Sequence, residues 1–247
     1  MKSYGDFAFF YDELTRNIDY KKRAEYFDSI IKKYGSQDKI LLDVACGTGS
    51  LSEEFCSLGY DVIGADPSED MLSVALDKKI ESKNDIMYLC QSAQELDLYG
   101  TVDNAVCALD SLNHITDETE LQKAVSRISL FLVPGGVFVF DVNTPYKHEH
   151  ILSSNTFVYE YDNVLCVWQN SECKDGEIQI TIDIFEKDEN GQYDRFSEQF
   201  LEKAYPLDTI RQICANAGLE VLEIFDEDSF NAPCETSQRI VFVTKKK

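Results

Sequence analysis

Hydrophobic positions along the first 145 residues alternate between continuous apolar runs and helical spacing. The runs have the length of strands and stand at 40–44, 59–66, 86–90, 102–109 and 137–142. Apolar residues recur every three or four positions at about 20–34, 51–58, 68–81 and 117–132, which indicates amphipathic helices. Because continuous apolar runs are typical of strands buried on both faces, this alternation predicts an α/β fold with a doubly covered, mostly parallel sheet.

The pattern changes after residue 145. Alternating positions predict strands at 157–161, 164–168, 177–185 and 196–202, separated by turn residues at 162–163, 174–176 and 189–191. A helix at 206–217, ended by Gly218, and strands at 219–226 and 238–244 complete the chain. We therefore expect a core of residues 1–145 and 205–247, with 146–204 inserted as a small antiparallel sheet over the substrate site or in a homodimer interface.

Composition limits the class of protein. The 247 residues fit one large domain, and 44% hydrophobic residues suffice for a sizeable core. We expect no membrane span, because no apolar run reaches 18 residues, and no secretory signal, because residues 1–6 are polar. The eight cysteines form no C-x-x-C pair, which favours reduced thiols in a cytoplasm.

Charge and histidine spacing bear on partners. The formal net charge of −22 argues against a nucleic-acid partner, because phosphate backbones are held by clusters of lysine and arginine. His148 and His150 form an H-x-H pair that lacks a third ligand at recognisable spacing, so we expect no metal site.

The most informative stretch is the glycine-rich turn after the first predicted strand. A buried strand ending in Ala45-Cys46-Gly47-Thr48-Gly49 feeds a helix, which brings backbone N–H groups and a positive helix end to a ligand. The dinucleotide pattern G-x-G-x-x-G is not met, because position 45 is alanine. Asp66 follows at the end of the second strand, 17 positions after Gly49, where a carboxylate suits two ribose hydroxyls. An N-cap role for Asp66 is the alternative, although Ser68 can also cap that helix.

With these features, the chain resembles class I S-adenosylmethionine (SAM)-dependent methyltransferases. Their D-x-G-x-G-x-G turn matches Asp43 to Gly49 with Ala45 in place of the first glycine, and their P-G-G turn and next strand match 134–142. The resemblance covers 35–145 and 205–244. It implies a Rossmann-like seven-stranded, mostly parallel sheet of order 3-2-1-4-5-7-6 with the last strand antiparallel, and SAM as cofactor. The cofactor contacts it implies are Asp43, Ala45, Cys46, Gly47, Thr48, Gly49, Asp66, Pro67, Ser92, Ala93 and Leu109.

The same resemblance suggests residues on the acceptor side. Asp110 and His114 follow the fourth strand, at the edge where open α/β sheets bind ligands. The F-A-x-x-Y-D pattern at 7–12 is similar to the N-terminal cap of small-molecule methyltransferases, which implies that the Tyr11 hydroxyl enters the site. An aromatic segment that only covers the sheet edge is the alternative for 4–16.

The sequence thus predicts an enzyme that transfers a methyl group to a nitrogen or oxygen of a small molecule. His114, Asp110 and Tyr11 are the candidate catalytic residues, and small-molecule or sugar N-methyltransferases are the members it resembles. An NAD(P)-dependent oxidoreductase, a non-catalytic SAM-binding or interaction protein, and, more weakly, an enzyme acting on RNA remain alternatives.

Overall fold

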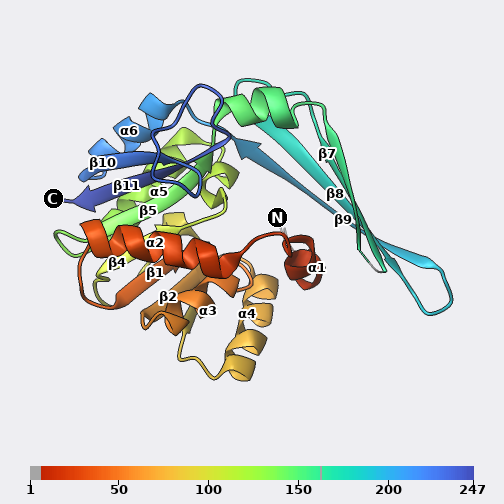
Figure 1. The fold of residues 1–247 in the computed structure, drawn as a ribbon, viewed down its shortest axis with the longest axis horizontal. Coiled ribbons are helices and arrows are strands. Elements are labelled where there is room, and N and C mark those ends of the chain that lie inside the picture. Colours follow the sequence, from red (N-terminus) through yellow and green to blue (C-terminus); the bar gives the residue numbers. More distant parts are fainter. Residues whose placement is uncertain (1–6, 162) are drawn as a thin grey trace.

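The computed structural model describes residues 7–161 and 163–247, which form two β-sheets and their covering helices (Figure 1). The larger sheet has the order β10-β11-β5-β4-β1-β2-β3. Its strands are β1 (Ile40–Val44), β2 (Asp61–Asp66), β3 (Met87–Cys90), β4 (Asn104–Cys107), β5 (Val137–Asn143), β10 (Leu219–Asp226) and β11 (Arg239–Lys246). Only β11 runs antiparallel to its neighbours, β5 and β10, which confirms the predicted order and the reversed last strand.

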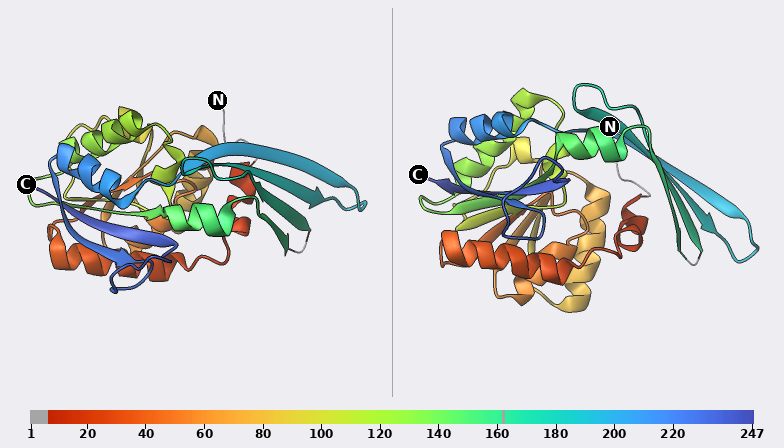
Figure 2. Two further views of the ribbon diagram at one scale, coloured as in Figure 1. Left: turned by 90° about the horizontal axis from the view of Figure 1, so that it is seen from above. Right: turned by 45° about the horizontal axis from the view of Figure 1, so that its top comes forward.

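Helices cover both faces of this sheet (Figures 1 and 2). Helices α2 (Tyr20–Tyr34) and α3 (Ser50–Ser57) cover one face, followed by α4 (Glu69–Ser82), whereas α5 (Glu118–Phe131) and α6 (Leu207–Asn216) cover the other. Side chains of β5 alternate between the two cores: Val137 and Val139 pack on the α2 side, and Phe138 and Phe140 pack on the α5 side. A strand buried on both faces therefore explains the continuous apolar run in the sequence.

The second sheet lies between β5 and α6 in the chain and projects from the body (Figure 1). We call its four antiparallel strands the inserted sheet: β6 (Thr156–Tyr161), β7 (Val164–Asn170), β8 (Glu177–Lys187) and β9 (Tyr193–Lys203). Every second residue of β8 from Ile178 to Ile184 is buried, and this apolar face packs with Phe7, Phe10 and Leu152. The alternation in the sequence therefore corresponds to one buried face and one exposed face.

Some elements differ from the prediction. Residues Phe7–Leu14 form a helix of their own, α1, which contacts α4 and β9 and lies between the body and the inserted sheet (Figure 2). Strand β4 is shorter than predicted, because the backbone turns into the left-handed region at Leu109 and Asp110. The linker after β5 forms a helix, η3 (Lys147–Leu152). Residues 1–6 and Asp162, part of a predicted turn, lie outside the described residues.

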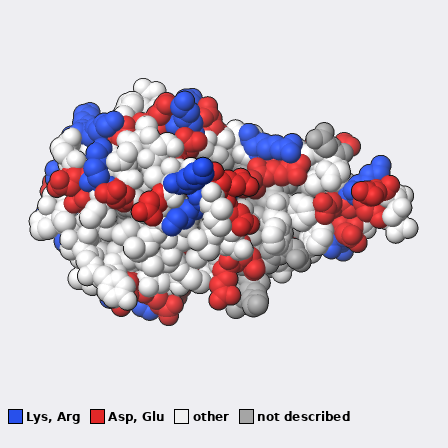
Figure 3. All heavy atoms as spheres, turned by 90° about the horizontal axis from the view of Figure 1, so that it is seen from below, with Lys and Arg blue, Asp and Glu red and all other residues white. Residues whose placement is uncertain are grey.

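The face of the molecule drawn in Figure 3 carries lysines and arginines in small groups next to acidic side chains. Among residues 7–161 and 163–247, no helix is long and apolar enough to cross a membrane.

Candidate functional site

A large cleft lies where the carboxyl ends of the parallel strands face the inserted sheet. It has a volume of about 1420 Å³. Its walls come from the ends of β1, β2, β3 and β4, from α1, and from the inner side of the inserted sheet. Because pockets for one ligand span about 300–1,000 Å³, this cleft can hold two small molecules at once.

The glycine-rich turn forms one end of the cleft. Ala45, Gly47 and Gly49 all have positive φ angles, of 56°, 54° and 74°. A Cβ added at Gly47 would meet no described atom within 4 Å, so this glycine leaves room on the cleft side. A Cβ added at Gly49 would instead overlap the Tyr88 hydroxyl. Gly49 is therefore required for packing behind the turn.

Asp66 and Asp43 are buried acidic residues next to the glycine-rich turn. The carboxylate of Asp66 accepts the N–H groups of Gly47 and Ser68, both at 2.9 Å. Ser68, and not Asp66, is the N-cap of α4. Each carboxylate oxygen can accept a second hydrogen bond, so Asp66 retains capacity for ligand hydroxyls. Asp43 is buried and accepts from the Ser52 hydroxyl at 2.6 Å, and burial raises its pKa to about 7.

A polar cluster that no sequence motif indicates connects α1 to this turn. Asp12 accepts hydrogen bonds from Thr48 at 2.7 Å and from Ser50 at 3.2 Å, and it pairs with Lys78 at 2.5 Å. Lys78 also donates to Ser50 at 2.6 Å. We call these four residues the α1 latch, because they join α1, the turn with α3, and α4 across the rim of the cleft.

The ends of β3 and β4 continue the cleft wall. Ser92 and Ala93 line it beside Gln94, and the Ser92 hydroxyl lies 3.3 Å from a carboxylate oxygen of Glu95. After β4, the N–H groups of Leu109 and Asp110 donate to the buried Asp141 at 2.9 and 2.6 Å.

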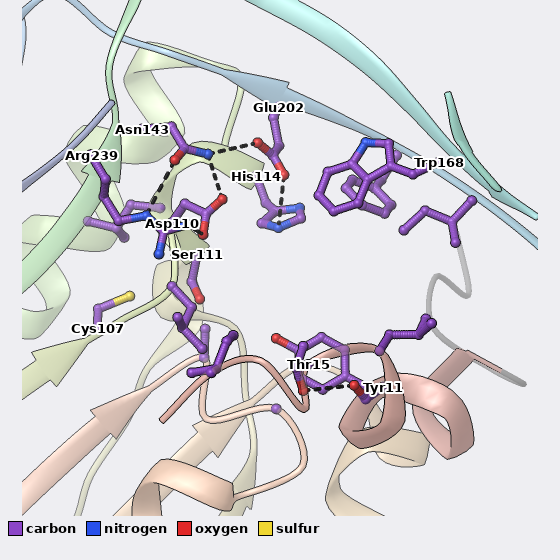
Figure 4. Close-up of a pocket in the computed structure, with 18 of the residues that line it drawn as sticks. Tyr11, Thr15, Cys107, Asp110, Ser111, His114, Asn143, Trp168, Glu202 and Arg239 are labelled. Carbon is purple, nitrogen blue, oxygen red and sulfur yellow. Dashed lines mark hydrogen bonds and ion pairs between the residues drawn. The ribbon is translucent and has the colours of Figure 1, made fainter. Parts of the chain in front are cut away.

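Beyond β4, a network of charged and amide side chains lines the cleft (Figure 4). Arg239 donates to Asp110 at 2.7 Å, and Asn143 donates to the other Asp110 oxygen at 2.5 Å. Asn143 also accepts from Lys147 at 2.8 Å and donates to Glu202 at 3.3 Å. These residues come from β11, β5, η3, β9 and the turn after β4, so only the fold brings them together.

The charges of this network shift the pKa values of Asp110 and Lys147. Burial opposes the charge on Asp110, but the neighbouring Arg239, with Lys147 and His114, holds its pKa at about 2. Burial lowers the pKa of Lys147, although the Asp110 carboxylate opposes this shift. Asp110 is therefore a stable anion that serves poorly as a proton acceptor at neutral pH.

Glu202, near the end of β9, reaches from the inserted sheet into the body of the protein. Its two oxygens face two imidazoles: Oε1 lies 3.7 Å from Nε2 of His114, and Oε2 lies 3.6 Å from Nε2 of His148. His114 lines the cleft and packs against Phe200 with tilted rings whose centroids are 5.0 Å apart, whereas His148 is fully buried. His150 is exposed, so the H-x-H pair does not converge, and no group of three or more metal-binding side chains occurs within 7–161 and 163–247.

The structure brings together most of the residues predicted for the site. The cleft is lined by Tyr11, Ala45, Gly47, Pro67, Ser92, Ala93, Leu109, Asp110 and His114. Asp43, Cys46 and Thr48 line a small adjoining pocket, where Cys46 lies close to Gly64 and the Thr48 hydroxyl belongs to the α1 latch. Gly49 and Asp66 support the turn without lining either space. Sequence reasoning missed Arg239, Lys147 and Glu202 as functional candidates, whereas the polar residues 143–145, directly after the fifth strand, were expected at the mouth of the site, and Asn143 does line the cleft.

Comparisons with known proteins agree with this geometry. A family model described as a methyltransferase domain matches residues 41–136. The chain is 32% identical to a methyltransferase of Geobacillus sp. (strain WCH70), covering 99% of this chain and 100% of the relative. A SAM-dependent methyltransferase from Clostridium acetobutylicum ATCC 824 shares 33% identity and a TM-score of 0.89 over 98% of both chains. The sugar N-methyltransferase KedS8 from Streptoalloteichus sp. ATCC 53650 shares the fold, at 22% identity and a TM-score of 0.80 over 98% of this chain and 93% of its own.

The strand order and the cleft at the strand ends define a Rossmann-like enzyme fold. Since the identity extends over the whole chain, the protein belongs to the SAM-dependent methyltransferases. SAM is its cofactor, and the site fits one: Gly47 leaves open space and Asp66 lies beside it at the end of β2. These relatives therefore support an enzyme that uses SAM over the alternatives of an NAD(P)-dependent oxidoreductase or a non-catalytic protein.

Proposed function

We propose that this enzyme transfers the methyl group of SAM to a nitrogen or oxygen of a small molecule bound beneath the inserted sheet. The observation that carries the proposal is the single cleft, which runs from the glycine-rich turn to the inserted sheet and exceeds the volume of one ordinary ligand pocket. Bound at the turn, SAM supplies an electrophilic methyl group on a sulfonium. The protein contributes mainly by holding the acceptor in line with that methyl group.

For the cofactor end, we propose that the backbone from Ala45 to Gly47 borders the cofactor and that Asp66 accepts its ribose hydroxyls. A carboxylate fixed by two N–H groups is already oriented, so binding orders few additional atoms. Ser92 and Ala93 would border the adenine, and Leu109 the region near the sulfonium, since all three line the cleft.

The other end has two surfaces, which suit an amphipathic acceptor. Phe157, Trp168 and Phe200 line its apolar side below the inserted sheet. The polar side holds Asp110 and Arg239, whose charges are already paired with each other. A compact molecule with one polar reactive group and an apolar part would therefore bury both without leaving a charge unpaired.

Among relatives that match about half of this chain are proteins named glycine/sarcosine N-methyltransferase and ubiquinone biosynthesis O-methyltransferase. Nitrogen and oxygen acceptors are thus both represented among similar proteins. KedS8, named a sugar N-methyltransferase, shares the fold over almost the whole chain, which makes amino sugars a sensible first set of acceptors to try.

Of the three candidate catalytic residues, we assign the proton acceptor to His114. Asp110 is held as an anion by Arg239, and its low pKa makes it a weak base. His114 lies in the cleft, and its imidazole faces the carboxylate of Glu202 at 3.7 Å. Tyr11 lines the opposite side, on α1, and we assign it to orienting the acceptor (Figure 4).

The test combines binding with an acceptor screen. Calorimetry should show saturable binding of SAM and of S-adenosylhomocysteine, with affinity at least tenfold weaker in Asp66→Asn. Glu69→Gln, three residues further along and exposed on α4, should bind as the wild type does. Formation of S-adenosylhomocysteine is then measured with amines, amino sugars, phenols and alcohols. Turnover only with a macromolecule such as RNA would contradict the small-molecule assignment.

A further inference from the structure

The inserted sheet contributes one carboxylate to the body of the enzyme, and its surroundings are specific. Glu202 is 5% exposed and lies between two imidazole nitrogens, Nε2 of His114 at 3.7 Å and Nε2 of His148 at 3.6 Å. Asn143 donates to it at 3.3 Å. These three neighbours come from η2 (Ser111–His114), β5 and η3, so residues from three places in the core surround a single side chain of β9.

The hydrogen-bonding roles of these atoms can be worked out from their partners. Nδ1 of His148 lies 2.9 Å from the carbonyl oxygen of Gly176. Because a carbonyl only accepts, this nitrogen carries a proton. Nε2 of His148 is buried and makes no hydrogen bond within the described part of the chain. This nitrogen faces Oε2 of Glu202 at 3.6 Å, a separation longer than a hydrogen bond.

These contacts determine the hydrogen-bonding role of the other carboxylate oxygen of Glu202, Oε1. Oε2 accepts from Asn143 and faces His148, which leaves Oε1 toward His114, and a carboxylate oxygen only accepts hydrogen bonds. Nε2 of His114 therefore meets an acceptor and is favoured as a donor. The separation of 3.7 Å is that of an ion pair and exceeds a hydrogen bond, and contacts of this kind commonly shorten when substrate is bound.

We propose that Glu202 is a positioning residue that fixes the tautomer of His114, with the proton on Nε2 and with Nδ1 as the basic nitrogen. This inference rests on the proposed function for its use in catalysis. The acceptor atom bonds to the methyl carbon with a lone pair, and the electrons of the broken carbon–sulfur bond remain on the sulfur of the S-adenosylhomocysteine product. The acceptor's proton passes to Nδ1, and the electrons of the broken bond to hydrogen stay on the acceptor atom. His148 and Asn143 hold Glu202 from the far side.

This arrangement gives the inserted sheet a role beyond covering the acceptor. The carboxylate that orients the base belongs to β9, and Phe200, two residues earlier, packs against the same imidazole with a ring-centroid distance of 5.0 Å. A displacement of β9 would therefore remove both supports of His114 at once.

The tautomer of His114 can be measured by NMR in the absence of a methyl acceptor. The chain has only three histidines, so long-range proton–nitrogen NMR spectra of protein labelled with ¹⁵N-histidine can be assigned with His148→Gln and His150→Gln. At a pH where the rings are neutral, we expect wild-type His114 as a single Nε2–H tautomer. Glu202→Ala should give a mixture of both tautomers. Glu198→Gln, on the same strand four residues toward its tip, should leave the wild-type signal unchanged.

An Nδ1–H tautomer in the wild type would overturn the proposal, even if every Glu202 variant failed to fold. An unchanged tautomer in folded Glu202→Ala would overturn it as well. With an acceptor from the screen, Glu202→Gln should lower kcat about 10- to 100-fold, a part of the 10²–10⁴ typical of general base catalysis, and change the Kd for SAM less than twofold. Failure of SAM binding would instead refute the proposed function and leave the NMR result standing.

Discussion

Asp43, under the glycine-rich turn, provides a quantitative test of how burial shapes this site. Its side chain is buried and accepts a hydrogen bond from the Ser52 hydroxyl, and burial raises its pKa from 3.8 to about 7. The folded protein therefore binds this proton more tightly than the unfolded chain does. The resulting stability is complete below pH 4 and is lost as the pH rises through 7.

The loss follows from the two pKa values. Each pH unit between them is worth 1.36 kcal/mol, so the full span amounts to about 4 kcal/mol, and the part between pH 5 and pH 7 to about 3 kcal/mol. Asp43→Asn keeps the size of the side chain and an oxygen for Ser52, but it cannot ionise. Between pH 5 and pH 8, the wild type should therefore lose about 3 kcal/mol more unfolding free energy than Asp43→Asn does.

Urea unfolding at pH 5, 6, 7 and 8 measures this difference, because all other titrating groups are shared by the two proteins. Asp61→Asn, an exposed aspartate at the start of β2, controls for a general change in charge and should follow the wild type. Parallel pH dependence in the wild type and Asp43→Asn would refute the argument that Asp43 is protonated in the folded protein below pH 7.

Two further predictions concern the turn and its contacts. Gly49→Ala places a Cβ against the Tyr88 hydroxyl and puts alanine at a φ of 74°, so we expect a loss of at least about 2 kcal/mol in unfolding free energy, measured by urea unfolding. An unchanged midpoint would show that the turn rearranges freely. Asp12→Asn weakens the pair with Lys78, and hydrogen exchange in α1 should quicken about fivefold, in line with a partly exposed ion pair worth about 1 kcal/mol, while Glu13→Gln on the same helix should not change it.

The sequence predicts the larger sheet well because burial leaves a strong local signal. Strands covered on both faces are mostly apolar, and Gly47 follows such a strand while Asp66 ends the next one, at the spacing typical of ribose recognition. The motif spacing does not reveal which side of the turn faces the cleft. The Cys46 sulfur lies close to Gly64, and the backbone of Gly49 packs close to the Tyr88 hydroxyl, and these contacts become evident only in the folded structure.

The acceptor side is harder to predict, since its contacts join distant parts of the chain. Arg239 meets Asp110 across 129 positions, and Glu202 lies between His114 and His148 only because β9 returns to the body beside η2. No local sequence pattern predicts contacts between residues that lie so far apart in the chain. A glutamate in an alternating strand is expected to be exposed, and its burial becomes evident only when three other elements surround it.

Asp141 shows why the end of β4 has the shape that the site needs. Leu109 and Asp110 both adopt left-handed backbone angles, which cost about 1–2 kcal/mol for each residue with a side chain. Their N–H groups converge on the Asp141 carboxylate, and hydrogen bonds to a charged acceptor are worth about as much, so the bend is sustained. Arg23 and Arg239 balance the buried carboxylate from opposite sides. One acidic residue of β5 thus sets the positions of both Leu109 and Asp110 in the wall of the cleft.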